Sequence, residues 1–128
     1  MYPENLRYTK EHEWIRVEGD HGTIGVTDYA QQQLGDVVFL ELPEAGRALK
    51  AGENFGTVES VKAVSELFCP VAGDVVETNA ALVKAPESIN SDPYGQGWMI
   101  VVKLRDPAEA AALMDAKVYA ALVEAEGK

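Results

Sequence analysis

The chain has 128 residues, 47% of them apolar and 25% charged, a mixture typical of one globular domain and not of a disordered, collagenous or coiled-coil chain. Its 11 Lys and Arg against 21 Asp and Glu give a net charge of −10, which disfavours nucleic acid and anionic membranes as partners. No apolar run approaches the roughly 18 residues that cross a bilayer. The single cysteine, Cys69, cannot form an intramolecular disulfide and fits a reducing compartment.

Strand patterns dominate the sequence. Apolar and polar side chains alternate over residues 13–18 and 23–26, and residues 37–42 form a strongly apolar run. Residues 43–89 remain β-like, with glycine or proline at short intervals, and residues 98–104 form another clear strand. The sequence therefore predicts a mainly β fold.

A short helix is predicted between the second and third of these strands. Thr27 suits the N-cap, because its hydroxyl can accept a hydrogen bond from a free backbone N–H of the first turn. Asp28 would face the positive end of the helix dipole. Gly35 is placed to end the helix, which would cover residues 28–34.

A helical tail is predicted over residues 107–126, with an interruption near Asp115. Asp106 suits the N-cap, Pro107 suits the first helical position, and Glu109 lies where a capping box would have its acid. Four apolar side chains of the tail are expected to pack on the body: Leu113, Met114, Val118 and Leu122.

A four-residue motif occurs twice, as 43–46 and as 70–73, and each copy leads on to a Glu-Ser pair, at 59–60 and 87–88. We interpret the two copies of the motif as marking two β-rich half-units in a quasi-twofold sandwich, since a solenoid would need about three copies or more. The alternative is a chance recurrence of turn residues. With no linker visible, one domain over residues 1–128 is predicted, with its core at about 13–104.

Most catalytic patterns are absent from the sequence, including those for phosphate loops, nucleophile elbows and zinc proteases. His12 lies between two glutamates, but adjacent side chains of an extended strand point to opposite faces, so a hydrogen-bonded surface histidine is favoured over a metal ligand. Cys69 has no base nearby in the sequence and is expected to be a buried apolar residue. Glu59 and Glu66 could form an acid–base pair or lie on a solvated hairpin face.

Lys62 is the only cation between Lys50 and Lys84, and it lies about midway between the two half-units. A lone lysine on an exposed turn offers a flexible four-carbon stem that ends in an amine. That amine can form an amide with a carboxylic-acid cofactor once an outside enzyme has activated the acid. From the residues alone, an ordinary surface lysine is the favoured interpretation of this position.

Short motifs along nearly the whole chain match one protein family. In chain order they are Glu11-His12-Glu13-Trp14, Thr23-Ile24-Gly25-Val26-Thr27 with Ala30-Gln31, Leu34-Gly35-Asp36-Val37-Val38-Phe39, Glu41-Leu42-Pro43, Val58-Glu59-Ser60-Val61-Lys62-Ala63, Pro70-Val71-Ala72-Gly73, Asn90, Asp92-Pro93-Tyr94-Gly95 and Gly97-Trp98. Together and in this order they resemble the lipoyl-carrying H proteins of the glycine cleavage system. The resemblance implies a lipoyl-type hammerhead, a flattened β-barrel or sandwich of two quasi-twofold-related halves, with a short helix in its first half and C-terminal helical segments.

The resemblance also implies a carrier rather than an enzyme, with lipoate attached to Lys62 by an amide. The arm would accept an aminomethyl group from a pyridoxal-phosphate-dependent glycine decarboxylase (P protein). A tetrahydrofolate-dependent aminomethyltransferase (T protein) would unload it, and a dihydrolipoyl dehydrogenase (L protein) would reoxidise it. A lipoate-attaching enzyme is a further implied partner. We expect a monomer in the bacterial cytoplasm.

The same resemblance implies which residues surround the arm. Glu13 and Glu66 match positions where family members place acids near the arm, and the immediate neighbours of the lysine are Glu59, Ser60, Val61 and Ala63. No metal ligands are expected. Biotin carriers usually have methionine on both sides of the lysine, which Val61 and Ala63 argue against. An additional role as lipoyl donor and a non-lipoylated acidic interaction module remain as alternatives.

Overall fold

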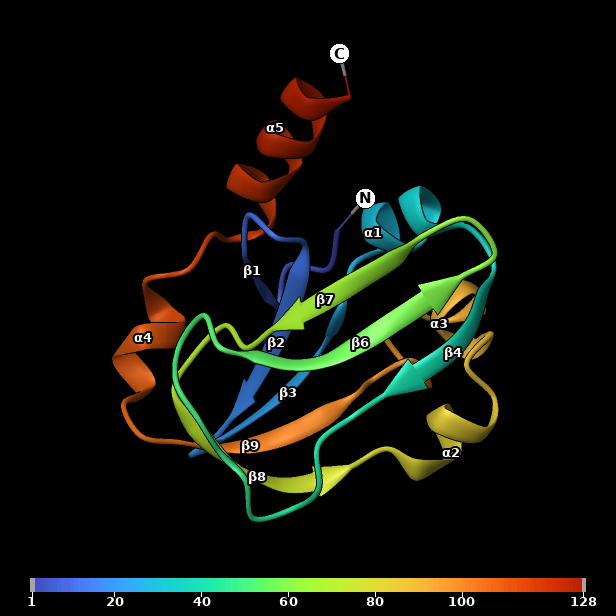
Figure 1. The fold of residues 1–128 in the computed structure, drawn as a ribbon. Coiled ribbons are helices and arrows are strands. Elements are labelled where there is room, and N and C mark those ends of the chain that lie inside the picture. The colour runs from blue at the N-terminus through green and yellow to red at the C-terminus, as the bar shows by residue number, and fades with distance from the viewer. Residues whose placement is uncertain (1, 128) are drawn as a thin grey trace.

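The computed structural model describes residues 2–127, so Met1 and Lys128, the ends of the predicted domain, lie outside the described residues. Two antiparallel sheets face each other (Figure 1). The strands are β1 (Arg7–Tyr8), β2 (Glu13–Glu18), β3 (His21–Val26), β4 (Val37–Glu41), β5 (Ala48–Leu49), β6 (Asn54–Ser60), β7 (Val64–Phe68), β8 (Gly73–Thr78) and β9 (Ile100–Leu104). The larger sheet has the order β1-β2-β3-β9-β8-β5 and the smaller has the order β4-β6-β7. The predicted mainly β fold is thus confirmed.

Five helices flank the two sheets in the described residues: α1 (Asp28–Leu34), α2 (Ala80–Lys84), α3 (Ser88–Ser91), α4 (Pro107–Ala111) and α5 (Ala116–Glu126). The prediction for α1 is confirmed at both ends. The Thr27 hydroxyl accepts a hydrogen bond from the N–H of Ala30, and Gly35 follows the helix with a φ of 77°. That left-handed conformation suits glycine, which has no Cβ to clash.

The segment from residue 80 to residue 91 differs from the β-like prediction, because it forms α2 and α3. The Asn79 side chain caps α2 by accepting from the N–H of Leu82, and the buried side chains of Leu82 and Ile89 fasten the two helices to the core. The two motif copies therefore fold differently. The first leads into β5 and β6, whereas the second leads into β8 and two helices, so the motif marks turns and not equivalent half-units.

The C-terminal tail divides at Asp115, as predicted, and the Asp115 side chain caps α5. Two other expectations for this tail are wrong. Glu109 closes no capping box, because its carboxylate accepts instead from the N–H of Ala72 in the body (3.0 Å). Val118 points away from the body and is 54% exposed, while Leu113, Met114 and Leu122 do pack against the buried clusters.

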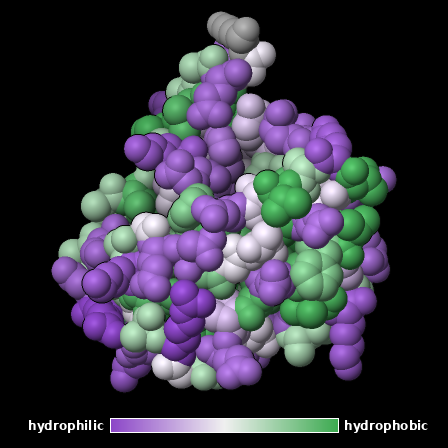
Figure 2. All heavy atoms as spheres, in the orientation of Figure 1, coloured by the Kyte–Doolittle hydropathy of each residue, from purple (hydrophilic) through white to green (hydrophobic). Residues whose placement is uncertain are grey.

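The buried side chains form two clusters. The larger lies between the sheets and includes Leu40, Val58 and Ile100. The smaller joins the N-terminal segment to α5, with the Tyr8 and Tyr119 rings stacked at 4.6 Å between centroids. Within residues 2–127, no helix has the length and apolar content to cross a bilayer. In Figure 2 the surface is largely hydrophilic, but apolar residues gather along the edge that carries β4 and the β6–β7 turn.

Candidate functional site

Lys62 lies in the tight turn that joins β6 to β7, and its neighbour Ser60 closes that turn. The N–H of Ser60 donates to the carbonyl of Ala63 (2.8 Å), and the Ser60 hydroxyl accepts from the N–H groups of Ala63 (3.0 Å) and Lys62 (3.3 Å). The N–H of Val61 donates to the carbonyl of Asp36 (3.0 Å), which ties the turn to the segment before β4. A serine side chain here replaces the Asn-Gly pair usual in short hairpins.

The stem of Lys62 lies against the backbone at the end of α1. A methyl group added at Gly35 would lie 3.2 Å from the Cε of Lys62. Gly35 therefore serves twice, since it ends α1 with a positive φ and leaves room for the lysine stem. The Lys62 side chain is exposed, and among residues 2–127 its amine forms no ion pair. The amine is thus free to be acylated.

A cleft of about 290 Å³ opens on one side of the hairpin, between β7, α1 and the segment before β2. Its lining residues are Glu11, His12, Glu13, Val26, Ala30, Gln33, Leu34, Val58, Ala63, Val64, Ser65, Glu66 and Leu67. Three of the residues expected around the arm, Glu13, Ala63 and Glu66, meet in this cleft. Ser60 shapes the turn instead, and Glu59 and Val61 are exposed outside the lining set.

Sequence reasoning missed most of the cleft wall, since its residues come from four separate segments. One signal was present, because Ala30 and Gln33 are three residues apart on the predicted helix and so share one face. No sequence pattern points to the contact between Gly35 and the lysine stem. That contact depends on how α1 packs beside the hairpin.

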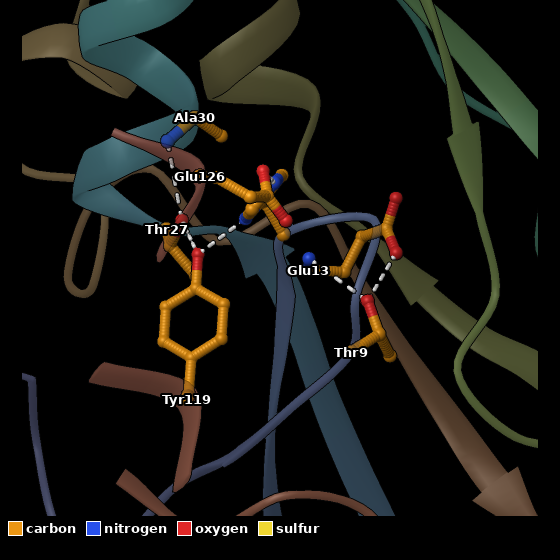
Figure 3. A network of polar contacts seen from close by, with 7 residues as sticks. Thr9, Glu13, Thr27, Ala30, Tyr119 and Glu126 are labelled. Atoms are coloured by element: carbon orange, nitrogen blue, oxygen red, sulfur yellow. Dashed lines mark hydrogen bonds and ion pairs between the residues drawn. The ribbon is translucent and has the colours of Figure 1, made fainter. Parts of the chain in front are cut away.

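Glu13 is the buried acid of the cleft, with 2% of its surface exposed. One carboxylate oxygen accepts from the Thr9 hydroxyl (2.7 Å), as Figure 3 shows, and the other accepts from the N–H of Phe68 (3.2 Å). Burial raises the pKa of Glu13 to about 7, although these two hydrogen bonds oppose the shift by favouring the charged form. The carboxyl is therefore poised to change charge near neutral pH, or to balance a cation brought into the cleft.

His12 lines the cleft and belongs to a hydrogen-bonded network, whose members Tyr119, Thr27 and Glu126 are labelled in Figure 3. Its Nδ1 lies 2.7 Å from the Tyr119 hydroxyl, which lies 2.7 Å from the hydroxyl of Thr27, the N-cap of α1. Its Nε2 lies 3.0 Å from a carboxylate oxygen of Glu126 in α5. The hydrogen-bonded interpretation of His12 is confirmed, and the network fixes α5 against the elements that line the cleft. Among the described residues, no cluster of three or more His, Cys, Asp or Glu could hold a metal ion.

The other candidate groups have structural explanations. Cys69 is 1% exposed, and burial raises its pKa to about 11, so the thiol stays protonated and the prediction of a buried apolar residue is confirmed. In the strand register Glu59 lies opposite Val64 and Glu66 lies opposite Thr57, so the two glutamates are diagonal neighbours and not a directly opposed pair. Both are exposed, which favours a solvated hairpin face over an acid–base pair.

Comparisons with known proteins converge on one family. The family model described as glycine cleavage H-protein matches residues 6–126. A glycine cleavage system H protein of Bacteroides thetaiotaomicron is 56% identical over 122 residues, covering 95% of this chain and 97% of that protein. Another, from Symbiobacterium thermophilum, is 58% identical over 122 residues and covers 95% of each. The crystal structure of a glycine cleavage system H protein from Mycobacterium marinum is 41% identical and matches with a TM-score of 0.86 over 94% of this chain and 97% of that one.

Proposed function

Because the chain belongs to the glycine cleavage H-protein family, a family of non-catalytic carrier subunits, we propose that it carries lipoate as an amide on the Nζ of Lys62. The observation that carries this proposal is the position of Lys62. Its amine is exposed at the tip of a hairpin, its stem lies over Gly35, and a cleft with a buried acid opens beside it. We treat residues 1–128 as a single carrier domain.

The residues present fit such an arm. A flexible lysine stem on a rigid turn gives the attached group a fixed origin and a wide reach. When bound, lipoate would supply a disulfide that takes up the aminomethyl group left after glycine decarboxylation and is later restored by oxidation. The cleft combines apolar walls, such as Val26 and Leu34, with carboxylates that suit a hydrocarbon chain ending in a cationic amine.

Two of the three acids that line the cleft, Glu13 and Glu66, have different tasks in this proposal. Glu13 is buried and hydrogen-bonded, so its ionised form balances the charge of an amine from a fixed position. Glu66 is exposed at the margin and adds a second negative charge that is screened by solvent. The apolar walls exclude water from the amine and so slow its loss by hydrolysis.

The partners in the proposal are the other components of the glycine cleavage system. Specifically, we propose the decarboxylase, the aminomethyltransferase, the dihydrolipoyl dehydrogenase and a lipoate-attaching enzyme, acting on a monomer in the bacterial cytoplasm. The net charge of −10 supports transient encounters with basic surfaces of these enzymes. A single shuttle that visits several enzymes needs fast encounters more than tight complexes.

The proposal is tested by attaching lipoate in vitro. The unmodified protein is incubated with lipoate, ATP and a lipoate–protein ligase, and the modified peptide is mapped by mass spectrometry. We expect one lipoyl group, on Lys62. Lys62→Arg should abolish the modification, whereas Lys117→Arg, a matched change at an exposed lysine of α5, should leave it unchanged. Attachment at another lysine, or none with a ligase active on a second carrier, would contradict the proposal.

A further inference from the structure

A β-bulge distinguishes the side of the hairpin away from the cleft. In the pairing of β4 with β6, Val37 lies opposite Ser60 and Phe39 lies opposite Glu59, so Val38 is the extra residue. A regular strand would turn one of two consecutive side chains inward. The bulge instead leaves both Val38 and Phe39 outward, 52% and 51% exposed.

Phe39 also lines an apolar groove of about 820 Å³ between β4, β8 and α2. Val76 and Val83, which are 43% and 40% exposed, contribute to the groove from β8 and α2. Its charged lining residues are three carboxylates and one lysine: Glu41, Glu44, Glu77 and Lys84. The groove thus offers apolar contact area within an acidic border.

This apolar surface begins beside Lys62. Val61, the residue before the lysine, is 70% exposed, and its N–H donates to the carbonyl of Asp36, two residues before Val38. We name Val61, Val38, Phe39, Val76 and Val83 the apolar face; much of it lies along the edge shown in Figure 2. Exposed contiguous apolar surface of this kind marks an interaction site, and β4 is an edge strand of its sheet.

We propose that the apolar face is the docking surface for the enzyme that acylates Lys62; this inference rests on the proposed function. Acylation joins the Nζ to the carbonyl carbon of an acyl adenylate. The new C–N bond forms as the C–O bond to phosphate breaks, nucleoside monophosphate leaves with the bonding electrons, and the Nζ gives up a proton. The bare stem is only four carbons long, so the enzyme must approach the turn closely and contact what surrounds it.

The acylating enzyme differs from the other proposed partners in how close to Lys62 it must bind. Enzymes that act on the disulfide work at the far end of a completed arm, and they need not contact the base of the hairpin. The cleft side also exposes an apolar residue, Val64 (67%), but its cavity is smaller, about 290 Å³ against about 820 Å³ for the groove, and its exposed margin carries Glu11 and Glu66. The apolar face is therefore the larger of the two apolar surfaces that begin at the turn, and it can supply binding energy before the arm exists.

Charge complementarity argues for this partner over a second copy of the chain. Two copies of net charge −10 that docked groove to groove would bring their carboxylate borders together. The partner that fits presents apolar side chains bordered by Lys or Arg. Its contacts with Glu41, Glu44 and Glu77 would set orientation and encounter rate more than affinity.

The test compares the kinetics of lipoylation with the kinetics of reduction of the lipoyl group once it is attached. Full-length unmodified protein is assayed with lipoate, ATP and ligase as wild type, as Val38→Ser/Phe39→Ser, and as Val76→Ser/Val83→Ser. Val118→Ser on α5, another half-exposed valine, is the matched control, and each variant's fold is checked by circular dichroism. We expect the KM for the first double variant to rise about tenfold with kcat retained, a smaller rise for the second, and none for the control.

Each variant is then lipoylated to completion with excess ligase, and its lipoyl group is reduced with dihydrolipoyl dehydrogenase and NADH. We expect the rate of this reduction to be the same in all variants and in the wild type. An unchanged KM in both double variants would overturn the inference. Equal losses in lipoylation and reduction would also overturn it, as would self-association of the wild type that the double variants abolish. A wild type that accepts no lipoate at Lys62 would instead overturn the proposed function itself.

Discussion

The two sides of the β6–β7 hairpin differ in what they place beside the same lysine. On one side is a cleft with a buried, hydrogen-bonded carboxyl, Glu13, whose pKa is raised to about 7. On the other side Val38 and Phe39 are half-exposed on a bulged edge strand. The first suits a small cationic group that needs protection from water, and the second suits a macromolecular surface. One lysine can therefore serve two kinds of contact without competition between them.

Backbone geometry produces this difference. The cleft exists because α1, β7 and the segment before β2 come together around a concave space. Val38 and Phe39 both belong to the apolar face because one extra residue in β4 turns these consecutive side chains outward. Burial on the cleft side raises the pKa of a carboxyl, whereas on the other side apolar side chains remain in contact with water.

The largest expected effect is on the free energy of unfolding, and it distinguishes the side chains of β4 that point into the core from those that are exposed. Leu40 is 1% exposed, and its neighbour Phe39 is 51% exposed. Leu40→Ala should lower the free energy of unfolding by about 2–5 kcal/mol, because it removes buried methyl groups and leaves a cavity. Phe39→Ala should change it by less than about 0.5 kcal/mol. Urea unfolding followed by tryptophan fluorescence measures both, and equal losses would make Phe39 a structural residue rather than a docking residue.

A smaller effect concerns the acid of the cleft. The pKa of Glu13 rises from 4.5 in the unfolded chain to about 7 in the folded protein. Between these values the folded state holds a proton that the unfolded chain has released, so stability falls as pH rises from 4.5 to about 7 and then levels off. The fall should be at most about 3 kcal/mol. Glu13→Gln should remove it, and Glu66→Gln, at an exposed position, should retain it.

Stability curves of the wild type and both variants at pH 5 and pH 8 decide this point. If Glu13→Gln kept the wild-type difference between the two pH values, the carboxyl would not be buried in a way that perturbs it. The cleft would then be no more than a solvated surface, and the contrast between the two sides of the hairpin would weaken.

Local signals in the sequence predicted the elements whose ends depend on their own residues. Thr27 and Gly35 placed both ends of α1, and Asp115 placed the break in the C-terminal tail. In each case one side chain or one φ angle fixes the boundary without help from distant residues.

Features that depend on distant packing could not be predicted in this way. The cleft joins Glu13 to Glu66 across 53 residues of chain, and the bulge at Val38 exists only through its pairing with β6. Glu109 has the capping-box position, but a backbone N–H of the body offered a better partner. Val118 fits an apolar stripe in the sequence, yet α5 turns that residue to solvent.

We propose that the cleft, and not the apolar face, shelters the arm on Lys62. The most direct measurement is the time for which the lipoylated protein retains an aminomethyl group once loaded, in the wild type, in Glu13→Gln and in Val38→Ser/Phe39→Ser. We predict that Glu13→Gln loses the group about tenfold faster, since a charged hydrogen bond is removed, and that the double variant matches the wild type. Equal retention in all three proteins would contradict the account.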